Sequence, residues 1–422
     1  MSLVPDRSDA GQVARVHRLR LRLVTNLDRL VPRLRPYATS VFAELSAMAI
    51  RLGAINLGQG FPDTDGPEEL KRIAIAAIED GTGNQYPPGH GQPDLRAAIA
   101  EHQQRFYGLA IDPATDVVVS TGASEAIGAT LISLLYPGDE VIILEPYFDL
   151  YAAAIAIAGG VRRAVPLRMA ESGSAAGFRL DPEALRNAVT SRTRMILLNS
   201  PHNPTGMVLT REELAHVAEV AIAHDLIVLS DEAYEHLVFD PHVHIPIATL
   251  PGMAQRTVTV GSGGKSFSFT GWKVGWASGP ADLIAAVRVV RQHLSYVSGG
   301  PFQPAIAAGL RLPDDYFSQF AANLAQRRDR LSAGLAKLGL GVLPTEGTYF
   351  LTTDIRPLGF TDGDLFCREL PTRAGVVAIP VAALADDRDL FRPYVRWTFC
   401  KTPEVIDRAL AQLEGSRLTD AW

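Results

Sequence analysis

The sequence predicts an α/β fold in which helices cover both faces of a mostly parallel sheet, together with a smaller α+β domain. Three observations lead to this prediction. From about residue 116 onward, short apolar runs alternate with helical patterns. Runs that are apolar along their whole length are typical of parallel strands that are buried on both faces. After about residue 312, this alternation gives way to one long helical pattern followed by several short strand-like runs.

The elements of the larger part are expected in the following order. The runs that predict strands are 116–120, 140–144, 195–200, 226–230 and 256–261. The helical patterns are 124–136, 151–160, 183–190 and 211–225. Asp181-Pro182 provides a favourable N-cap and first-turn pair for the third of these helices. Thr210 and Glu213 match a capping box at the start of the fourth.

The C-terminal part is expected to contain a long helix, three strand regions and a last helix. These segments are 316–339, 347–354, 375–380, 394–399 and 403–414. The N-terminal residues up to about Gly66 are too few to fold alone, so we expect them to join this smaller domain. The predicted organisation is an N-terminal arm (1–34), the first part of the small domain (35–66), the large domain (67–311) and the rest of the small domain (312–422).

The arm is rich in arginine between residues 11 and 35, interleaved with Leu and Val. This pattern is compatible with an amphipathic surface helix or with a transit peptide. Asp6, Asp9 and Asp28 count against a targeting function, so a solvated arm is favoured.

The composition excludes several classes of function. The chain has 422 residues, 47% of them hydrophobic, and a formal net charge of −6. Without an excess of positive charge, nucleic acid is not expected as a partner. The sequence lacks an apolar run long enough for a membrane span and the apolar core of a secretory signal, so we expect a cytoplasmic protein. Cys367 and Cys400 lack metal-ligand spacing; we expect buried thiols and no metal.

Polar segments follow each of the predicted strands of the large domain. They are TGAS at 121–124, EPYFD at 145–149, SPHNPTG at 200–206, DEAY at 231–234 and GSGGK at 261–265. In open α/β sheets, ligands bind at the carboxyl ends of the strands. The sequence therefore predicts that these segments converge on one binding site.

The segment GSGGKSFSFTGWK (261–273) allows two interpretations of Lys265. In a phosphate-binding P-loop, a glycine would be required at position 259, where the chain has Thr259, and a helix would follow the lysine. An aromatic segment follows instead. A G-x-G-x-x-G dinucleotide motif does not follow any predicted strand either. A lysine that binds a cofactor covalently and an ordinary solvated loop lysine both stay open on this segment alone.

Four segments together resemble fold-type I pyridoxal-phosphate (PLP) enzymes, the class I/II aminotransferases. They are SPHNPTG (200–206), SDEAYEHLVF (230–239), SGGKSFSFTGWKVGW (262–276) and YVRWTFCK (394–401). NLGQGFPD (56–63) and NQYPPGHG (84–91) resemble the kynurenine, glutamine and methionine aminotransferase branch. The run LRPYATSVFAELSAMA (34–49) looks closest to actinobacterial N-succinyldiaminopimelate aminotransferases. The resemblance implies a seven-stranded type of sheet in the large domain.

The resemblance also implies how the cofactor is held at its reactive end. Lys265 matches the lysine that bonds to the PLP aldehyde and later transfers a proton. Asp231, at the end of a buried strand, matches the carboxylate that pairs with the protonated ring nitrogen. Tyr234 and Asn203 match the residues that reach the phenolic oxygen, although Asn-Pro is also an ordinary turn pair. Phe148 aligns with the aromatic ring that stacks on PLP.

The phosphate and substrate contacts are implied in the same way. Ala123 and Ser124 open a helix after a strand, where N–H groups favour an anion. Ser262 and Lys273 match further phosphate contacts, and Tyr86 matches a tyrosine that reaches the phosphate across a homodimer interface. The substrate-binding residues expected are Gly58, Asn203 and Arg396. Arg396 would bind the α-carboxylate of the substrate through two hydrogen bonds. The alternative role for this arginine is a salt bridge at the protein surface.

The function that the resemblance implies is transfer of an amino group from an amino acid to a 2-oxo acid, with 2-oxoglutarate expected, by a ping-pong mechanism. N-succinyl-LL-2,6-diaminopimelate is the natural substrate suggested. Kynurenine-, glutamine- or methionine-type transamination, and a cysteine-conjugate carbon–sulfur β-lyase, share the same PLP contacts and remain open. A non-catalytic ligand-sensing module is the alternative from a different class, and the intact Lys265 argues against it.

Overall fold

The computed structural model describes residues 29–170, 177–416 and 418 of the chain. The chain divides into two units, residues 1–40 and 41–422. In the first unit, η2 (Pro32–Tyr37) is a 3-10 helix, and the Arg35 Nε donates a hydrogen bond to the carbonyl of Leu30 at 3.1 Å. Residues 1–28 of the predicted arm lie outside the described residues. All other elements belong to the second unit.

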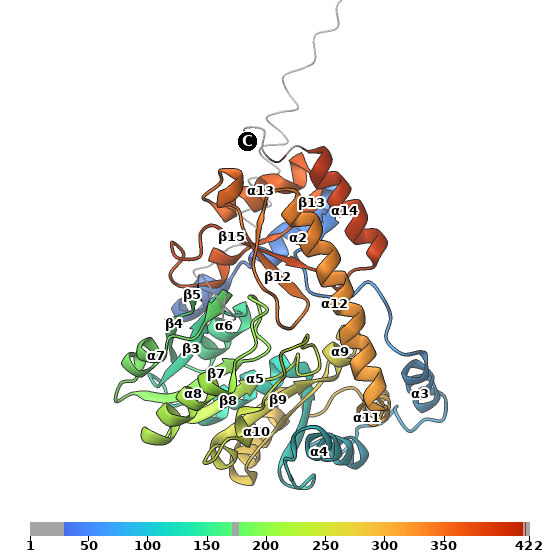
Figure 1. Ribbon diagram of the computed structural model, residues 1–422. Helices are drawn as coiled ribbons and strands as arrows, with labels where there is room; N and C mark the ends of the chain where they lie inside the picture. Colours follow the sequence, from blue (N-terminus) through green and yellow to red (C-terminus); the bar gives the residue numbers. More distant parts are fainter. Residues whose placement is uncertain (1–28, 171–176, 417, 419–422) are drawn as a thin grey trace, which may run out of the picture. The chain divides into compact units, whose positions relative to one another are not determined.

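The second unit contains a seven-stranded, mostly parallel sheet in the order β2-β10-β9-β8-β7-β3-β4 (Figure 1). Only β10 runs antiparallel to its neighbours, β2 and β9. The strands are β2 (Val117–Thr121), β3 (Glu140–Glu145), β4 (Val161–Pro166), β7 (Thr193–Asn199), β8 (Ile227–Asp231), β9 (Thr257–Ser262) and β10 (Val274–Ser278). The predicted fold class is confirmed.

Two strands of this sheet were not predicted from the sequence, and both depart from a continuous apolar run. The edge strand β4 contains Arg162 and Arg163, and its residues are mostly half-buried. The strand β10 contains Gly275 and Ser278 and directly follows the aromatic segment after Lys265. Continuous apolar runs identify strands that are buried on both faces, and they miss edge strands and strands that contain glycine.

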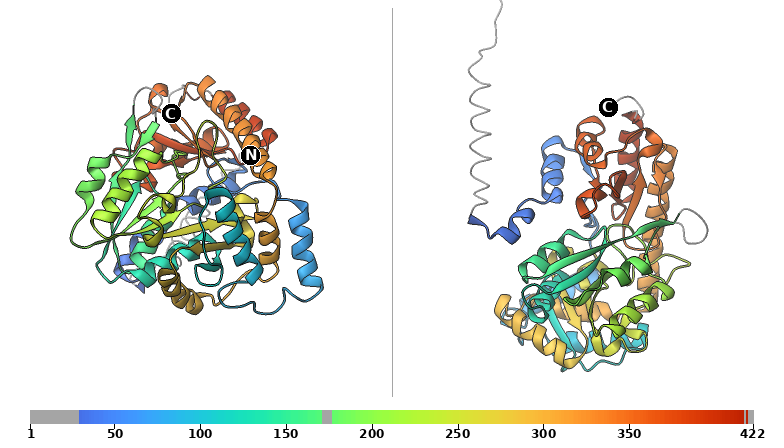
Figure 2. Two further views of the ribbon diagram at one scale, coloured as in Figure 1. Left: turned by 60° about the horizontal axis from the view of Figure 1, so that its bottom comes forward. Right: turned by 90° about the vertical axis from the view of Figure 1, so that its left-hand side faces the viewer.

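Helices cover both faces of the sheet (Figures 1 and 2). They are α3 (Glu68–Glu79), α4 (Pro93–Tyr107), α5 (Gly122–Leu134), α6 (Asp149–Ile157), α7 (Pro182–Ala188), α8 (Arg211–Ala223), α10 (Ala281–Leu294) and α11 (Phe302–Leu310). Paired residues on neighbouring strands point to the same face. Trp276 pairs with Val119, and both pack with Leu95 of α4 and Ile306 of α11. The opposite face packs against α5, α6 and α10.

The helix caps expected from the sequence are present. Asp181 accepts hydrogen bonds from the backbone N–H groups of Glu183 and Ala184 at the start of α7. Thr210 and Glu213 form the reciprocal capping box of α8. Each such cap contributes about 1 kcal/mol because it satisfies backbone donors that have no partner within the helix.

A second, antiparallel sheet has the order β11-β12-β15-β14. Its elements and neighbours are α2 (Val41–Leu52), β1 (Ile55–Asn56), α12 (Asp314–Lys337), β11 (Gly341–Val342), β12 (Phe350–Asp354), η6 (Arg356–Leu358), α13 (Gly363–Arg373), β13 (Val376–Val377), β14 (Ile379–Pro380), η7 (Val381–Leu384), β15 (Tyr394–Thr398) and α14 (Pro403–Gly415). The strand β1 pairs in parallel with β13. This pairing places residues 55–56 beside residues 376–377, and the predicted division into domains, with boundaries at 66/67 and 311/312, stays a prediction.

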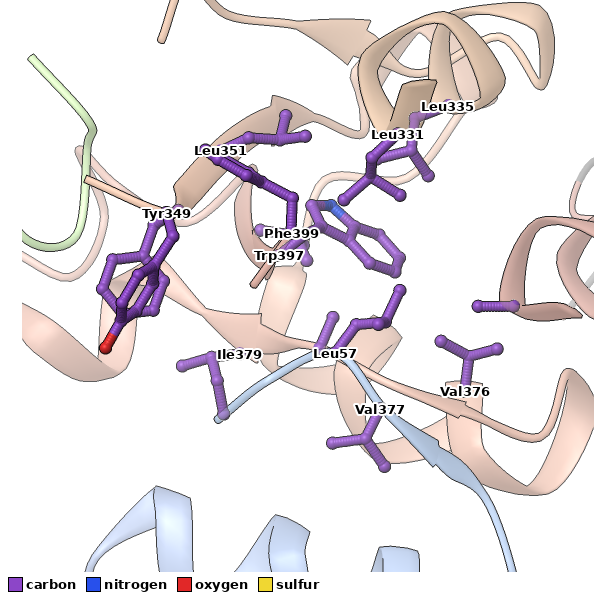
Figure 3. Close-up of a cluster of buried hydrophobic side chains, with 14 of the residues drawn as sticks. Leu57, Leu331, Leu335, Tyr349, Leu351, Val376, Val377, Ile379, Trp397 and Phe399 are labelled. Atoms are coloured by element: carbon purple, nitrogen blue, oxygen red, sulfur yellow. The ribbon is translucent and has the colours of Figure 1, made fainter. Parts of the chain in front are cut away.

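The core of this region is built around Trp397 of β15 (Figure 3). Leu331 and Leu335 of α12, Leu57 and Phe399 are buried in the same cluster. The apolar positions 324, 331 and 335 of α12 recur at helical spacing, so one stripe of this long helix faces the core. Cys367 and Cys400 are also buried here as free thiols, as expected from the sequence.

The remaining short elements are connectors. They are β5 (Arg168–Ala170), β6 (Gly177–Arg179), η3 (Ile247–Thr249), η4 (Ala254–Arg256), α9 (Gly263–Ser266) and η5 (Thr270–Trp272). Among the described residues, no helix combines the length and the apolar character that crossing a membrane requires.

The antiparallel strand β10 passes very close to the first turn of α5. A Cβ atom added at Gly275 would lie 2.5 Å from the backbone nitrogen of Ala123. Gly122, the first residue of α5, has a φ of 71°, in the left-handed region that favours glycine. The absence of a side chain at both positions lets the start of α5 lie directly against β10.

We predict that Gly275→Ala lowers the free energy of unfolding by about 1–3 kcal/mol, because backbone atoms of α5 must move to accept the methyl group. The matched control is Gly128→Ala on α5, where an added Cβ meets open space. The control is expected to be neutral or stabilising by up to about 1 kcal/mol, since alanine favours a helix more than glycine does. Chemical denaturation measures both changes, and equal stability of the two variants would contradict the prediction.

Candidate active site

A cavity of about 360 Å³ lies at the carboxyl ends of the large sheet's parallel strands and is also bounded by residues of the small sheet. The predicted site residues that line it are Ala123, Ser124, Phe148, Asn203, Asp231, Tyr234, Ser262, Lys265, Lys273 and Arg396. They come from segments after β2, β3, β7, β8 and β9, from the turn before β10, and from β15. The structure thus brings together residues that lie up to 273 positions apart in the sequence, from Ala123 to Arg396.

Lys265 lies in the one-turn helix α9, and its amine faces the cavity. The Nζ donates a hydrogen bond to the Tyr349 hydroxyl at 2.7 Å, and a longer one to the Gly60 carbonyl at 3.4 Å. Burial lowers the pKa of the Lys265 amine to about 8, against the opposing effect of the Asp231 carboxylate. A substantial fraction of this amine is therefore unprotonated at neutral to mildly alkaline pH, as a nucleophile requires.

Asp231 is the last residue of β8 and is buried. The Tyr151 hydroxyl donates to its Oδ2 at 2.6 Å, and the Ala233 N–H donates to its Oδ1 at 3.2 Å. Burial raises the pKa of this carboxyl group above its usual range, while the two hydrogen bonds and Lys265 act in the opposite direction. A cation placed beside Asp231 would favour its charged form.

A positive region lies at the other end of the cavity. The N–H groups of the first turn of α5 open toward it, and this helix N-terminus favours an anion. A Cβ at Gly122 would lie 3.2 Å from the Nζ of Lys273, so this amine lies beside the same turn. Lys273 has a φ of 54°, an uncommon conformation for a residue with a side chain. Ser262 adds a hydroxyl from the end of β9.

Arg396 lies on β15 and is only 1% exposed. Its Nη1 donates to the Asn203 Oδ1 at 2.8 Å, and its Nη2 donates to the Gly58 carbonyl at 2.7 Å. Its buried Nε has no hydrogen-bond partner among the described residues. Burial lowers the pKa of the guanidinium to about 10. This environment argues against the surface salt bridge considered from the sequence.

Gly58 and Tyr86 lie outside the residues that line the cavity. The Gly58 carbonyl accepts a hydrogen bond from Arg396, which lines the cavity. The next two residues, Gln59 and Gly60, line the cavity themselves. Tyr86 is 82% exposed and packs edge to face against Tyr296, with ring centroids 5.4 Å apart. The cavity of one chain therefore does not include Tyr86.

Two tyrosines contact the central charged groups but were not identified from the sequence. Tyr349 bonds to Lys265 and also donates to the Gly60 carbonyl at 2.6 Å. Tyr151 bonds to Asp231 from the first turns of α6. Both occur in segments whose apolar pattern predicts a buried strand or helix, so an aromatic core residue is the ordinary expectation there. The hydroxyl of each residue, which finds a polar partner when buried, is the only signal in the sequence.

Comparison with known proteins decides the family. The family model for aminotransferase class I and II matches residues 53–413. The chain belongs to this family. It is therefore a PLP-dependent aminotransferase, an α/β enzyme that acts on amino acids and 2-oxo acids.

Individual relatives of this aminotransferase are similar over nearly their whole length. The chain is 51% identical over 391 residues to a probable N-succinyldiaminopimelate aminotransferase DapC of Mycobacterium tuberculosis, covering 91% of this chain and 97% of that protein. It is 36% identical to a kynurenine–oxoglutarate transaminase of Dictyostelium discoideum, covering 92% and 96%. The solved structure of the N-succinyldiaminopimelate aminotransferase from Mycobacterium tuberculosis matches with a TM-score of 0.88 and 52% identity, covering 92% and 99%.

The residues of the cavity fit PLP chemically. An amine with a lowered pKa suits an aldehyde, and a buried carboxylate suits a protonated ring nitrogen. A helix N-terminus with a lysine beside it suits a phosphate. The partnerless Nε of Arg396 leaves a donor available for the carboxylate of a substrate.

We predict that, in the enzyme freed of its cofactor, covalent capture of Lys265 by an aldehyde rises with pH and is half-maximal near pH 8. The reason is that only the unprotonated amine attacks, and burial lowers its pKa to about 8. Reductive trapping at a series of pH values, with peptide mapping by mass spectrometry, measures this profile. Lys337, whose side chain is 74% exposed, is the internal comparison. A Lys265 midpoint near the pKa of about 10.4 typical of free lysine would contradict the prediction.

Proposed function

We propose that this aminotransferase takes the amino group from N-succinyl-LL-2,6-diaminopimelate and passes it to 2-oxoglutarate, in two half-reactions that share one site. The observation that carries the chemistry is that Lys265, the buried Asp231 and the buried Arg396 line one cavity. The choice of substrate is supported by the 51% identity to the mycobacterial relative over most of both chains. When bound, PLP supplies an electron sink that stabilises negative charge at the substrate's α-carbon.

The proposed contacts to the cofactor follow the two ends of the cavity. Lys265 holds the aldehyde carbon covalently, and Asp231 pairs with the ring nitrogen. The remaining ring contacts are Tyr234, Asn203 and Phe148. The phosphate contacts proposed are Ala123, Ser124, Ser262 and Lys273. Supporting these assignments, the amide-rich turn and Lys273 lie at one end of the cavity, and the low-pKa amine is enclosed by aromatic and polar groups.

Lys265 is also proposed to move the proton. When it is not bonded to the cofactor, its Nζ would take a proton from the α-carbon of the amino donor and pass it to the cofactor carbon that retains the amino group, and the second half-reaction would run this transfer in reverse. A base is most effective when its pKa lies close to the working pH, and the pKa of about 8 meets this requirement. Tyr349 is proposed to orient the Nζ, since its hydroxyl lies 2.7 Å from it.

Arg396 is proposed to bind the α-carboxylate of both substrates. Its two Nη groups bond to Asn203 and to the Gly58 carbonyl, which fixes the plane of the guanidinium. A planar, fixed guanidinium can form two parallel hydrogen bonds with a carboxylate. Asn203 and Gly58 are accordingly included in the proposed substrate-binding set.

We further propose that the enzyme works as a homodimer in the cytoplasm, with Tyr86 reaching the phosphate bound by the other subunit. Tyr86 is 82% exposed in the single chain, which is high for an aromatic side chain. Contact with a second subunit would bury it, and this supports the proposed dimer. The large and small domains, with boundaries at 66/67 and 311/312, belong to the same proposal.

We predict that N-succinyl-LL-2,6-diaminopimelate gives a higher kcat/KM than methionine or kynurenine when each is paired with 2-oxoglutarate. Glutamate formation measures turnover, and a change in the absorbance of the bound cofactor measures the first half-reaction alone. Lys265→Ala is expected to lose at least about 10³-fold in turnover with every donor, because it removes both nucleophile and proton carrier.

The outcomes separate the alternatives. A response to methionine or kynurenine without one to the succinylated donor would end the assignment of substrate but not the transaminase mechanism. Pyruvate and ammonia released from a cysteine S-conjugate would indicate a carbon–sulfur β-lyase. Full turnover by Lys265→Ala would exclude the proposed mechanism and would leave a binding module as the explanation.

We predict that Arg396→Lys lowers kcat/KM by about 10- to 100-fold, mainly through a higher KM, because an ammonium cannot form the paired hydrogen bonds of a guanidinium. The absorbance of the bound cofactor should be unchanged. Steady-state kinetics with any accepted donor provides the measurement, and Arg211→Lys, exposed on α8, is the control. An unchanged KM would rule out Arg396 as the carboxylate-binding residue.

A further inference from the structure

A second cluster of chemically active side chains lies apart from the active site. It consists of His102 on α4 and of Glu235 and His236, which follow β8. One potential ligand atom from each residue lies within 4.8 Å of those of the other two. The Nε2 atoms of His102 and His236 are 2.7 Å apart. None of the three residues lines the cavity that contains Lys265.

The cluster contains buried polar atoms without partners. His102 is 1% exposed and Glu235 is 5% exposed. Within the described residues, the Nδ1 of His102 and the Oε2 of Glu235 have no hydrogen-bond partner, and the same holds for the Nδ1 of the neighbouring His244. A buried polar group left unsatisfied costs about 1–3 kcal/mol, and such groups usually mark a water molecule or an ion. Of the three proposed ligand atoms, the Oε2 of Glu235 is thus open to a further ligand, whereas the Nε2 atoms of His102 and His236 are hydrogen-bonded to each other and would exchange that bond for bonds to an ion.

The three side chains offer the donor atoms that a cation needs. The two imidazoles are joined by the hydrogen bond between their Nε2 atoms, and the Oε2 of Glu235 has no partner within the described residues. Imidazole nitrogen and carboxylate oxygen are both ligands of divalent metal ions.

The surroundings hold the histidines in place and leave a path from solvent. The ring of His236 stacks on Phe317 of α12 with centroids 4.1 Å apart, and Phe106 of α4 packs against both histidines. Glu235 and His236 also line a cavity of about 690 Å³, bordered by Asp240, His242 and His244 as further polar residues. An ion can therefore reach the cluster, and its ligands come from segments that are already packed together.

We propose that His102, Glu235 and His236 bind one Zn²⁺ ion, with a water molecule from the adjoining cavity as fourth ligand. Two imidazoles and one carboxylate with an open position form a donor set that zinc accepts in tetrahedral geometry. With Zn–N distances of about 2.0–2.1 Å, the two nitrogens would stand about 3.3 Å apart. They are now 2.7 Å apart, so the rings must separate by roughly 0.6 Å.

A zinc ion in this cluster would connect two segments of the fold. Glu235 directly follows Tyr234, which lines the active-site cavity, and β8 ends at Asp231. Zinc would tie α4 to this segment behind the active site. A metal that binds the folded chain and not the unfolded one raises stability. The sequence alone predicted no metal, because His102 lies 134 residues before His236 and the set lacks a short-range motif.

The test is zinc binding by the PLP-loaded enzyme, measured by equilibrium dialysis and elemental analysis on the wild type, Glu235→Gln, His236→Gln and His242→Gln. Wild type and His242→Gln, a variant of the same cavity outside the cluster, should hold about one zinc per chain. The two ligand variants should bind more than tenfold more weakly. Circular dichroism confirms that each variant is folded, and Glu235→Gln preserves the shape of the side chain.

Cobalt(II) provides an independent readout. Its visible absorption should indicate a four- or five-coordinate nitrogen and oxygen site in wild type and His242→Gln, and should be lost in His236→Gln. Zinc bound equally well by all four proteins would place the ion elsewhere, for instance on the cofactor phosphate, and would overturn the proposal. A wild-type enzyme that retains no zinc after dialysis at micromolar metal would overturn it as well.

Discussion

The enclosure of three charged groups in one cavity is the constraint on which the rest of the structure depends. Removing an amine, a carboxylate and a guanidinium from water costs several kcal/mol for each group unless partners compensate. Hydrogen bonds provide this compensation. Lys265 donates to the Tyr349 hydroxyl, and Asp231 accepts from the Tyr151 hydroxyl and the Ala233 N–H. Arg396 donates to Asn203 and to the Gly58 carbonyl. The seven-stranded sheet brings the first two groups together, and β15 of the antiparallel sheet carries the third.

Tyr349, Tyr151, Asn203 and Gly58 lie far in sequence from the charged groups that they contact, and only the Ala233 N–H is local, so the site forms only when distant parts of the second unit have folded together. The parallel strands place Asp231 and the loops after them at one edge of the sheet. The absence of a side chain at Gly275 of β10 then lets the first turn of α5 pack directly against this strand. Local stability and the geometry of the site therefore depend on the same contacts, and a core substitution such as the one at Gly275 is expected to affect both.

Much of this arrangement can be predicted from the sequence. Continuous apolar runs identified β2, β3, β7, β8 and β9, and the polar segments after them contain nearly half of the residues that line the cavity, including Asp231 and Lys265. The edge strand β4 and the glycine-containing β10 were missed, because their residues are not uniformly apolar. Tyr151 and Tyr349 were missed because a tyrosine in an apolar segment gives no indication of where its hydroxyl points. The His102 cluster depends on tertiary contacts between α4 and the segment after β8, which periodicity does not report.

The turn between β9 and β10 has a consequence for the size of molecule that the site accepts. Ser262 pairs with Gly275, so the intervening residues form a closed loop with fixed ends. This loop carries Lys265 near one end and Lys273 at the other. In their proposed roles, the two amines contact the aldehyde and the phosphate of the same cofactor, so the loop sets the span between them. A vitamin form without phosphate would reach only one of the two, and its affinity would depend on the covalent bond and ring contacts alone.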